Sequence, residues 1–345
     1  MKIVFFFFAI VFLFSSCKEI KNKEVTVLEL IPEKVISEID SLFFVNVNLA
    51  STKKDGNFIL SQYPSYIAKV NSSFEKVWIY DQEGEGPMDL SYPEQLVLDG
   101  RNISILDHGN QSLKIFGMDS GTFMSSLRLP EPVMKFRFSK STKGTYFFSV
   151  LDFVSNNSII EVDSSGNLIR HLGTLFPETG VGSNRQMKYF QLDENDNIIF
   201  VGASLPYIEI VDYKGGNQKR YSLEQYEPIK RALDSTENDI KTNKRGMGTN
   251  SIPSYIIDAQ YVKGRLYLSF TDRIGLDRSK ARNLLEFKIS TDGCELSRVF
   301  KFNTGTQDDE FHPQNFFVDE EGEKLLIQGL ITKNIYEFKI PKEPT

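Results

Sequence analysis

The run Asp196-Asn197-Ile198-Ile199-Phe200, followed after a second turn by Tyr207-Ile208-Glu209-Ile210-Val211, decides the fold of this 345-residue chain. The first run is apolar after its turn, which predicts a strand with both faces buried. The second run alternates, which predicts a strand that exposes one face. Asp196 and Asn197 suit the turn, because tight hairpins need residues that tolerate positive φ.

This unit of two strands recurs six times along the chain. Its turns are Asp55-Gly56, Asp99-Gly100, Lys143-Gly144, Asp196-Asn197, Lys263-Gly264 and Glu321-Gly322. Its alternating strands follow at 66–70, 113–116, 159–162, 207–211, 284–287 and 335–338. A period of about 45 to 65 residues is typical of propeller blades. We therefore predict an all-β fold, a six-bladed β-propeller; the alternative, unrelated hairpins in a sandwich, would not give six copies in one order.

The pattern also predicts how the ring closes. We expect blades at 42–80, 94–128, 134–172, 186–222, 255–301 and 314–341. The last blade has only three candidate strands, whereas residues 25–30 alternate and have no partner nearby in the sequence. An N-terminal strand that joins the last blade would close the ring and cover an open edge. Residues 25–345 are therefore expected to form one propeller domain.

The N-terminus has the features of an export signal. Lys2 precedes a short apolar run at 5–14, and Ser15 and Ser16 are the small residues before Cys17. The run is too short to cross a bilayer, which needs roughly 20 apolar residues. Residues 1–16 are thus predicted to be a signal peptide.

Phe14-Ser15-Ser16-Cys17 resembles the lipobox of bacterial lipoproteins, although Phe14 stands where leucine is usual. The resemblance implies lipid attachment at Cys17, with residues 17–24 as a lipidated tether. An ordinary secretory signal that happens to end near a cysteine is the alternative. Cys17-Lys18-Glu19 also partly matches a surface-export signal of Bacteroidota lipoproteins, and a generic charged spacer explains it as well.

Composition argues against a nucleic-acid partner and against an intramolecular disulfide. The chain has 40 Lys and Arg against 46 Asp and Glu, a net charge of −6, and no basic stripe, which argues against nucleic acid. With Cys17 lipidated, Cys294 has no disulfide partner. We expect Cys294 to be a small apolar strand or turn residue and not a redox group.

Together, the lipobox, the six repeats and the Gly86-Pro87 linker resemble the six-bladed TolB-like or NHL-like β-propeller lipoproteins of Bacteroidota. The resemblance implies a protein of the cell envelope, anchored to the outer membrane through lipid only and facing either the periplasm or the surface. It implies no catalytic residues, so none are assigned, and no cofactor is expected.

Propellers bind ligands at the end of the channel that carries the connections between blades and the second hairpin loop of each blade. Asp107, His108, His171 and His312 are expected on that face. Three histidines there could ligate zinc, but no spacing motif supports a metal and none is assigned; isolated surface histidines are the alternative. Asp107 and His108 could act as an acid–base pair, or Asp107 could stabilise its own turn.

The stretch 223–254 is the largest departure from the repeat. Its first part, 224–241, places Tyr226, Ile229, Leu233 and Ile240 on one stripe, which predicts an amphipathic helix. Pro228 would have to lie in the first turn of that helix. Lys241, Lys244 and Arg245 add a positive patch. We expect the stretch to fold over one face of the ring and border the partner site; a surface insertion without function is the alternative.

These observations favour a binding module for a protein, peptide or glycan. The alternative is a propeller hydrolase or lyase with a metal near the channel axis. An enzyme needs several inward-facing Asp, Glu, Asn or His side chains at one mouth of the channel, whereas a binding module needs an exposed, partly apolar rim. Tyr189, Tyr207 and Tyr255 lie near blade ends and are candidate aromatic ligand contacts.

Overall fold

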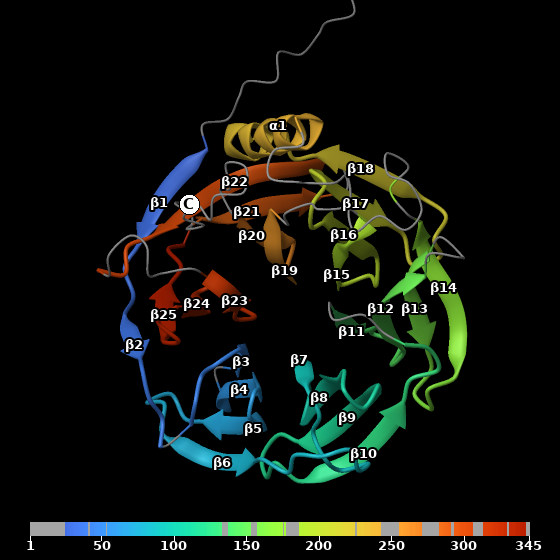
Figure 1. The fold of residues 1–345 in the computed structure, drawn as a ribbon, viewed down its shortest axis with the longest axis vertical. Coiled ribbons are helices and arrows are strands. Elements are labelled where there is room, and N and C mark those ends of the chain that lie inside the picture. The colour runs from blue at the N-terminus through green and yellow to red at the C-terminus, as the bar shows by residue number, and fades with distance from the viewer. Residues whose placement is uncertain are drawn as a thin grey trace, which may run out of the picture.

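A computed structural model of the chain describes residues 25–40, 42–52, 54–132, 137–152, 157–174, 176, 186–224, 226–242, 255–270, 283–290, 293–305, 313–329 and 331–342. Six sheets are arranged in a ring around a central axis (Figure 1). The predicted six-bladed β-propeller is therefore confirmed. The predicted signal peptide and tether lie outside the described residues. Within those ranges, no helix is both long enough and apolar enough to cross a membrane.

The first four blades each contain four antiparallel strands, which follow one another from the axis to the rim. Blade 1 contains β3 (Val47–Thr52), β4 (Gly56–Gln62), β5 (Ser65–Val70) and β6 (Lys76–Tyr80). Blade 2 contains β7 (Pro93–Asp99), β8 (Asn102–Asp107), β9 (Ser112–Gly117) and β10 (Phe123–Arg128). Blade 3 contains β11 (Phe138–Lys140), β12 (Tyr146–Asp152), β13 (Asn157–Val162) and β14 (Leu168–Thr174). Blade 4 contains β15 (Lys188–Leu192), β16 (Ile198–Gly202), β17 (Tyr207–Val211) and β18 (Gln218–Ser222).

The last two blades each receive a strand from the N-terminus. Blade 5 contains β19 (Ile256–Val262), β20 (Arg265–Phe270), β21 (Asn283–Ser290) and β22 (Gly293–Phe302), with β1 (Thr26–Leu30) added at its outer edge. Blade 6 contains β23 (Pro313–Val318), β24 (Lys324–Gly329) and β25 (Ile335–Lys339), with β2 (Lys34–Ile36) as its fourth strand. An N-terminal strand thus closes the ring at the last blade, as predicted.

The prediction that residues 25–30 supply this closing strand was wrong. Strand β1 pairs in parallel with β22 of blade 5, and it is β2 that pairs antiparallel with β25 (Figure 1). The chain passes the long outer strand of blade 5 before it reaches blade 6, and Leu30 is buried between those two blades. Residues 34–36 are too few to show a strand pattern in the sequence.

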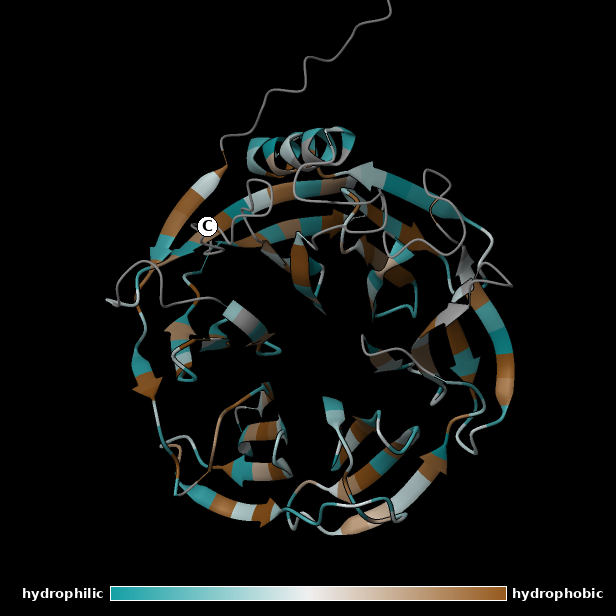
Figure 2. Ribbon diagram, in the orientation of Figure 1, coloured by the Kyte–Doolittle hydropathy of each residue, from teal (hydrophilic) through white to brown (hydrophobic). Residues whose placement is uncertain are grey.

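Apolar contacts between neighbouring blades form the core. Each of the six junctions holds one cluster of buried apolar side chains. Between blades 1 and 2, for example, Phe58 and Leu60 of β4 pack with Ile103 of β8 and Phe116 of β9. Burial of one such side chain stabilises the fold by about 1.5–3 kcal/mol. Figure 2 shows the apolar residues concentrated in the strands, with hydrophilic residues on outer strands such as β18.

The third strand of each blade differs from its prediction. These strands were expected to expose one face, yet the charged residue in each of them is buried. We call these residues the third-strand charges: Lys69, Lys114, Glu161, Glu209, Glu286 and Glu337. The reason is that neighbouring blades pack on both faces of a third strand, so that its polar face is covered and its charge is paired. Alternation in the sequence indicated a polar face but not the layer that covers it.

The one helix among the described residues is α1 (Glu227–Lys241), and it confirms the predicted amphipathic helix. Pro228 is its second residue, where the missing N–H does no harm. Ile229, Ala232 and Leu233 are buried against blades 4 and 5. Tyr255, one of the tyrosines selected from the sequence, donates its hydroxyl to Ala232 O at 3.2 Å. Helix α1 is thereby fixed at the rim beside β18 and β22 (Figure 1).

Candidate functional site at one end of the channel

The innermost strands β3, β7, β11, β15, β19 and β23 surround the axis of the ring (Figure 1). At the end where the chain enters these strands, a cavity of about 230 Å³ opens. We call this cavity the vestibule; its lining comes from all six blades and consists of Asn46, Asn48, Gln62, Tyr92, Glu94, Gln95, Arg137, Tyr189, Ile257, Asp258 and Asn315. This is the connection face, the end that carries the inter-blade connections and the second hairpin loops, where a ligand was predicted.

A second cavity, of about 410 Å³, continues along the channel toward the opposite end. Its middle is lined by apolar side chains such as Leu49, Leu96 and Val262, and Lys263 and Glu320 lie at its far end. Asn48, Gln95 and Arg137 line both cavities. Arg137 therefore stands between the vestibule and the apolar part of the channel.

Arg137 forms an ion pair that crosses the axis. Its guanidinium Nη2 contacts Oδ1 of Asp258, so the pair joins blade 3 to blade 5 and skips the blade between them. Asp258 is buried, and its Oδ1 also accepts a hydrogen bond from Ala259 N at 2.7 Å. The guanidinium lies 5.7 Å from the ring centroid of Tyr189 in blade 4. Its Nε is buried and has no hydrogen-bond partner among the described residues.

Burial shifts the proton equilibria of this group of residues. Burial lowers the pKa of Arg137 to about 10, although Tyr189 acts in the other direction. Burial raises the pKa of the Tyr189 hydroxyl to about 12, against the effect of the Arg137 charge. Both shifts have the sign that desolvation of a charged form gives. At neutral pH Arg137 remains charged and Tyr189 remains neutral, so the vestibule has a cation and an aromatic hydroxyl side by side.

Amide side chains around the channel join most blades to their neighbours. Asn48 donates to Glu94 O, Gln95 accepts from Phe138 N at 2.7 Å, and Gln191 donates to Ala259 O at 3.2 Å. Gln260 exchanges hydrogen bonds with Val318, and Asn315 donates to Val47 O at 2.7 Å. These amides have a structural role, since each satisfies backbone groups of the next blade. At the junction of blades 3 and 4, the contact of the Arg137 guanidinium with the Tyr189 ring occupies the corresponding place.

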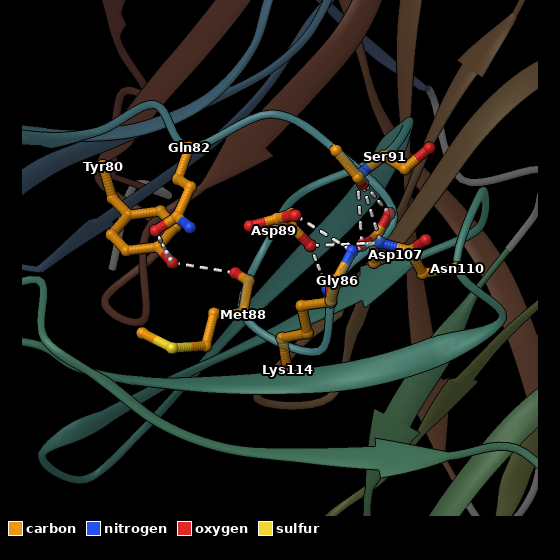
Figure 3. A network of polar contacts seen from close by, with 10 residues as sticks. Tyr80, Gln82, Gly86, Met88, Asp89, Ser91, Asp107, Asn110 and Lys114 are labelled. Carbon is orange, nitrogen blue, oxygen red and sulfur yellow. Dashed lines mark hydrogen bonds and ion pairs between the residues drawn. The ribbon is translucent and has the colours of Figure 1, made fainter.

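Asp107, proposed from the sequence for the ligand face, stabilises its own region instead. Its carboxylate is fully buried and lies 3.1 Å from Nζ of Lys114. It accepts hydrogen bonds from Ser91 N at 3.0 Å and Asn110 Nδ2 at 2.9 Å (Figure 3). Burial raises the pKa of Asp107, although Lys114 acts against the shift.

The network around Asp107 fixes the connection from blade 1 to blade 2. Lys114 donates to the carbonyls of Gly86 and Asp89 (Figure 3). Asn110 donates to the carbonyl of Gly84 at 3.2 Å. The buried ion pair of Asp107 and Lys114 thus fixes the connection from blade 1 to blade 2. The carboxylate of Asp107 contacts Ser91 N of this connection, the Asn110 side chain of its own turn and Lys114 of β9, and these contacts are structural.

The described histidines do not meet. His108 lies in the β8–β9 turn on the connection face, and its ring centroid is 6.3 Å from that of Tyr92, which lines the vestibule. His171 lies in the outermost strand of blade 3, where Nε2 is 3.0 Å from a carboxylate oxygen of Glu131. His312 is outside the described residues. Across the described ranges, no group of three or more His, Cys, Asp or Glu residues is placed to hold a metal ion.

The remaining predicted site residues are only partly described. Lys241 is the last residue of α1 and is exposed. Lys244, Arg245 and Cys17 lie outside the described residues. Cys294 is a free, half-buried thiol in β22, and burial raises its pKa to about 12. At neutral pH this thiol is protonated, which agrees with a packing role and not a redox role.

Of the vestibule residues, Tyr189 was predicted from the sequence as a candidate ligand contact and the others were not. Tyr207 packs instead near Arg220 and Phe176, outside the vestibule. The missed signal lies in the first strands of the blades, where polar residues such as Glu94, Asp258 and Asn315 stand near the start of a strand. The Asp, Glu and Asn types expected of an enzyme do gather at this mouth, but the amides and Asp258 are already engaged in contacts.

Comparison with known proteins supports the fold and goes no further. No protein-family model matches the sequence, and no curated protein matches it significantly. Among solved structures, a Bacteroides fragilis protein described as exported is similar, with 13% identity and a TM-score of 0.56 over 92% of this chain and 100% of that one. The Cps50 (Swd1) β-propeller domain of Myceliophteria thermophila has 9% identity and a TM-score of 0.55 over 90% of this chain and 100% of that domain.

The Pan2 WD40 domain of Neurospora crassa is a third similar structure, with 12% identity and a TM-score of 0.54. That comparison covers 86% of this chain and 89% of the Pan2 domain. At such identities the similarity shows a shared propeller fold, and a propeller fold supports many unrelated functions.

Proposed function

We propose that this protein is a lipid-anchored propeller of the cell envelope that binds a partner at its connection face. The observation that carries the proposal is the vestibule, to which all six blades contribute and in which Arg137, Glu94 and Asp258 bring charge to an open cavity. Cavities with a few convergent polar groups are the usual ligand sites of propellers and other folds. We therefore assign binding, and not catalysis, to the vestibule. Its partner is a protein, peptide or glycan.

The envelope address is supported by the sequence before the ring. Residues 1–16 have the pattern of an export signal, and Cys17 follows Ser15 and Ser16 as in a lipobox. The tether would end just before β1, so the ring begins a few residues from the lipid. The Bacteroides fragilis protein with the same fold is described as exported, which supports an extracytoplasmic address. The lipobox and the repeats are the basis for proposing an outer-membrane lipoprotein of the TolB-like or NHL-like kind.

Two experiments test this proposal. Cys17→Ala should leave an unlipidated precursor that no longer fractionates with membranes, and unchanged membrane association would contradict the anchor. For binding, the intact protein is cross-linked in envelopes of its native host and compared with the double variant Glu94→Gln, Asp258→Asn. The variant should lose the cross-linked partner, whereas Glu320→Gln at the opposite end of the channel should keep it. Equal capture by all three proteins would place the binding site elsewhere.

A second candidate function is an enzyme of the hydrolase or lyase kind, because Glu94 and Asp258 place two carboxylates in one cavity. Carboxylate and amide oxygens are ligands for hard divalent cations. Metal analysis of the purified protein distinguishes the two candidates: a stoichiometric metal that is lost in Glu94→Gln would favour the enzyme.

A further inference from the structure

The larger of the two channel cavities, of about 410 Å³, has a lining that the structure describes almost completely; we call it the inner channel. Each blade contributes four residues of its innermost strand or directly beside it. Apart from Lys53, these six strands and the turns that follow them lie within the described residues, whereas several connections around the vestibule do not. Glu194, Lys263 and Glu320 at the far end are exposed, so the inner channel opens to solvent there.

Apolar side chains from all six blades line the inner channel. They are Leu49, Ala50, Leu96, Val97, Leu98, Phe138, Leu192, Tyr261, Val262, Phe316, Phe317 and Val318. Leu98, Leu192 and Phe317 are only half-buried, although each packs partly on a core cluster, so apolar surface remains facing the cavity. Cavities of about 300–1,000 Å³ with a mainly apolar lining are the usual sites for small ligands.

The amide side chains along the walls are engaged in contacts between blades. Gln95, Gln191 and Gln260 bond to backbone groups of neighbouring blades. The apolar side chains are therefore the main contact surface that the walls offer. Such a lining holds water poorly, so an apolar ligand that displaces water from it gains binding free energy.

The charges of the inner channel cancel. Its lining contains three cationic side chains and three carboxylates, a formal net charge of 0, and these are Arg137, Lys140, Lys263, Asp193, Glu194 and Glu320. Lys140 pairs with Asp99, and Nζ of Lys263 lies 3.6 Å from Oε1 of Glu321. Oε2 of Glu194 accepts a hydrogen bond from the Tyr261 hydroxyl at 2.7 Å. The inner channel thus prefers neither a cation nor an anion.

We propose that the inner channel binds an uncharged, elongated apolar molecule of the alkyl-chain class, which enters from the far end and lies along the axis. Four residues of a strand span roughly 13 Å, which sets the length of chain that the channel can cover. The ion pair of Arg137 and Asp258 crosses the axis between the inner channel and the vestibule and limits how deep the ligand reaches. This inference goes beyond the proposed function, because it assigns a ligand to a cavity that the vestibule partner does not need.

The test titrates the folded, unlipidated ring with N-phenyl-1-naphthylamine, an uncharged apolar probe whose fluorescence rises when it leaves water, and then displaces the probe with 1-alkanols. The affinity of the alkanols should rise about fourfold for each added methylene from 1-hexanol onward. The rise should stop once the chain is longer than the channel. Decylamine and decanoate should bind no more tightly than 1-decanol, because the lining has no net charge.

Two variants and a matched control locate the binding site. Ser139 lines the inner channel and is only half-buried, so the phenyl ring of Ser139→Phe would occupy the cavity and weaken alkanol binding at least about tenfold. Leu192→Asn makes the wall polar without filling the cavity and should also weaken binding. The control is Phe43→Ser with Tyr63→Ser. These aromatic side chains are 66% and 67% exposed, outside the inner channel, and their replacement should leave binding unchanged.

Several results would overturn the inference. They are no binding of the probe, an affinity that does not depend on chain length, and tighter binding of a charged analogue. Equal binding by the wild type, Ser139→Phe and Leu192→Asn would also overturn it, and so would a loss confined to the Phe43 and Tyr63 variant, which would place the probe on the exposed surface. Envelope cross-linking that depends on Glu94 and Asp258 tests the proposed function separately, and neither result determines the other.

Discussion

The third-strand charges and the vestibule charges are made of the same residue types, are both largely buried, and do different things. Glu286 in β21 is contacted by Arg298, by Arg265 at 2.7 Å and by Ser297 at 2.6 Å, all of them on the same sheet. Arg137 instead reaches across the channel to Asp258, and its Nε has no partner within the part of the chain that the structure describes. Residues of its own sheet thus enclose the Glu286 carboxylate, whereas Arg137 and Asp258 line an open cavity.

The difference shows that burial of a charge does not by itself mark a functional site. The side chains of Asp107 and Lys114 are fully buried, yet the contacts of Asp107 are structural and hold the connection from blade 1 to blade 2 in place. A charged side chain becomes a candidate for ligand binding when it lines a cavity, contacts a residue of a blade that is not its neighbour, and keeps a hydrogen-bonding group without a partner. In the described structure, Arg137 meets all three conditions.

The largest effect is expected when a third-strand charge is removed from its partners. Glu286→Ala should lower the free energy of unfolding by about 3–5 kcal/mol, because it leaves Arg298 buried without its carboxylate. Urea unfolding followed by circular dichroism measures the change. The exposed Glu320 is the matched control, and Glu320→Ala should stay within about 0.5 kcal/mol. Equal losses in both variants would mean that the third-strand charges do not hold the ring.

Acid should weaken the ring through the same residues. Burial alone would raise the pKa of Glu286, but hydrogen bonds from Arg298 and Ser297 and the Arg298 charge hold it below its ordinary 4.5. A lowered folded pKa means that its stabilisation is complete above about pH 4.5 and is lost as pH falls through the folded value. Burial also acts to raise the pKa of Glu161, but hydrogen bonds from Thr145 and Arg170 outweigh it, so this pKa is lowered as well.

Unfolding free energies measured from pH 7 to pH 3 check this prediction. The wild-type protein should lose stability steeply below about pH 4.5, and Glu286→Gln should start less stable and show a shallower decline. Parallel curves for the two proteins would show that the charge of Glu286 contributes nothing to acid sensitivity.

The ion pair of Arg137 and Asp258 should tolerate removal of both charges better than removal of one. Arg137→Met with Asp258→Asn should cost no more than about 1 kcal/mol, whereas Arg137→Met alone leaves Asp258 buried without its cation and costs more. Thermal unfolding of the four proteins of this cycle gives the coupling energy. A double variant as unstable as Glu286→Ala would assign the Arg137 pair to the framework and weaken the case for the vestibule.

How far the sequence predicted these two regions follows from what each depends on. The repeat, the six blades and helix α1 follow from local periodicity and turn residues, so they were predicted with bounds within a few residues. The burial of Glu286 and the partner of β1 depend on the neighbouring blade, which no local pattern reveals. The vestibule needs Arg137 and Asp258, 121 positions apart in the sequence, to meet across the axis. His108 was placed on the correct face because its turn belongs to a regular part of the repeat.

The smallest effect is expected at Lys69, the third-strand charge of blade 1. Its partner Asp119 lies 3.7 Å away but is 83% exposed, so water screens the pair. Lys69 Nζ also donates to Met118 O at 3.4 Å and lies 5.7 Å from the ring centroid of Phe58. Asp119→Ala should therefore change the free energy of unfolding by less than about 0.5 kcal/mol in urea titrations. A loss close to that of Glu286→Ala would mean that position in the blade, and not exposure of the partner, determines what a third-strand charge contributes.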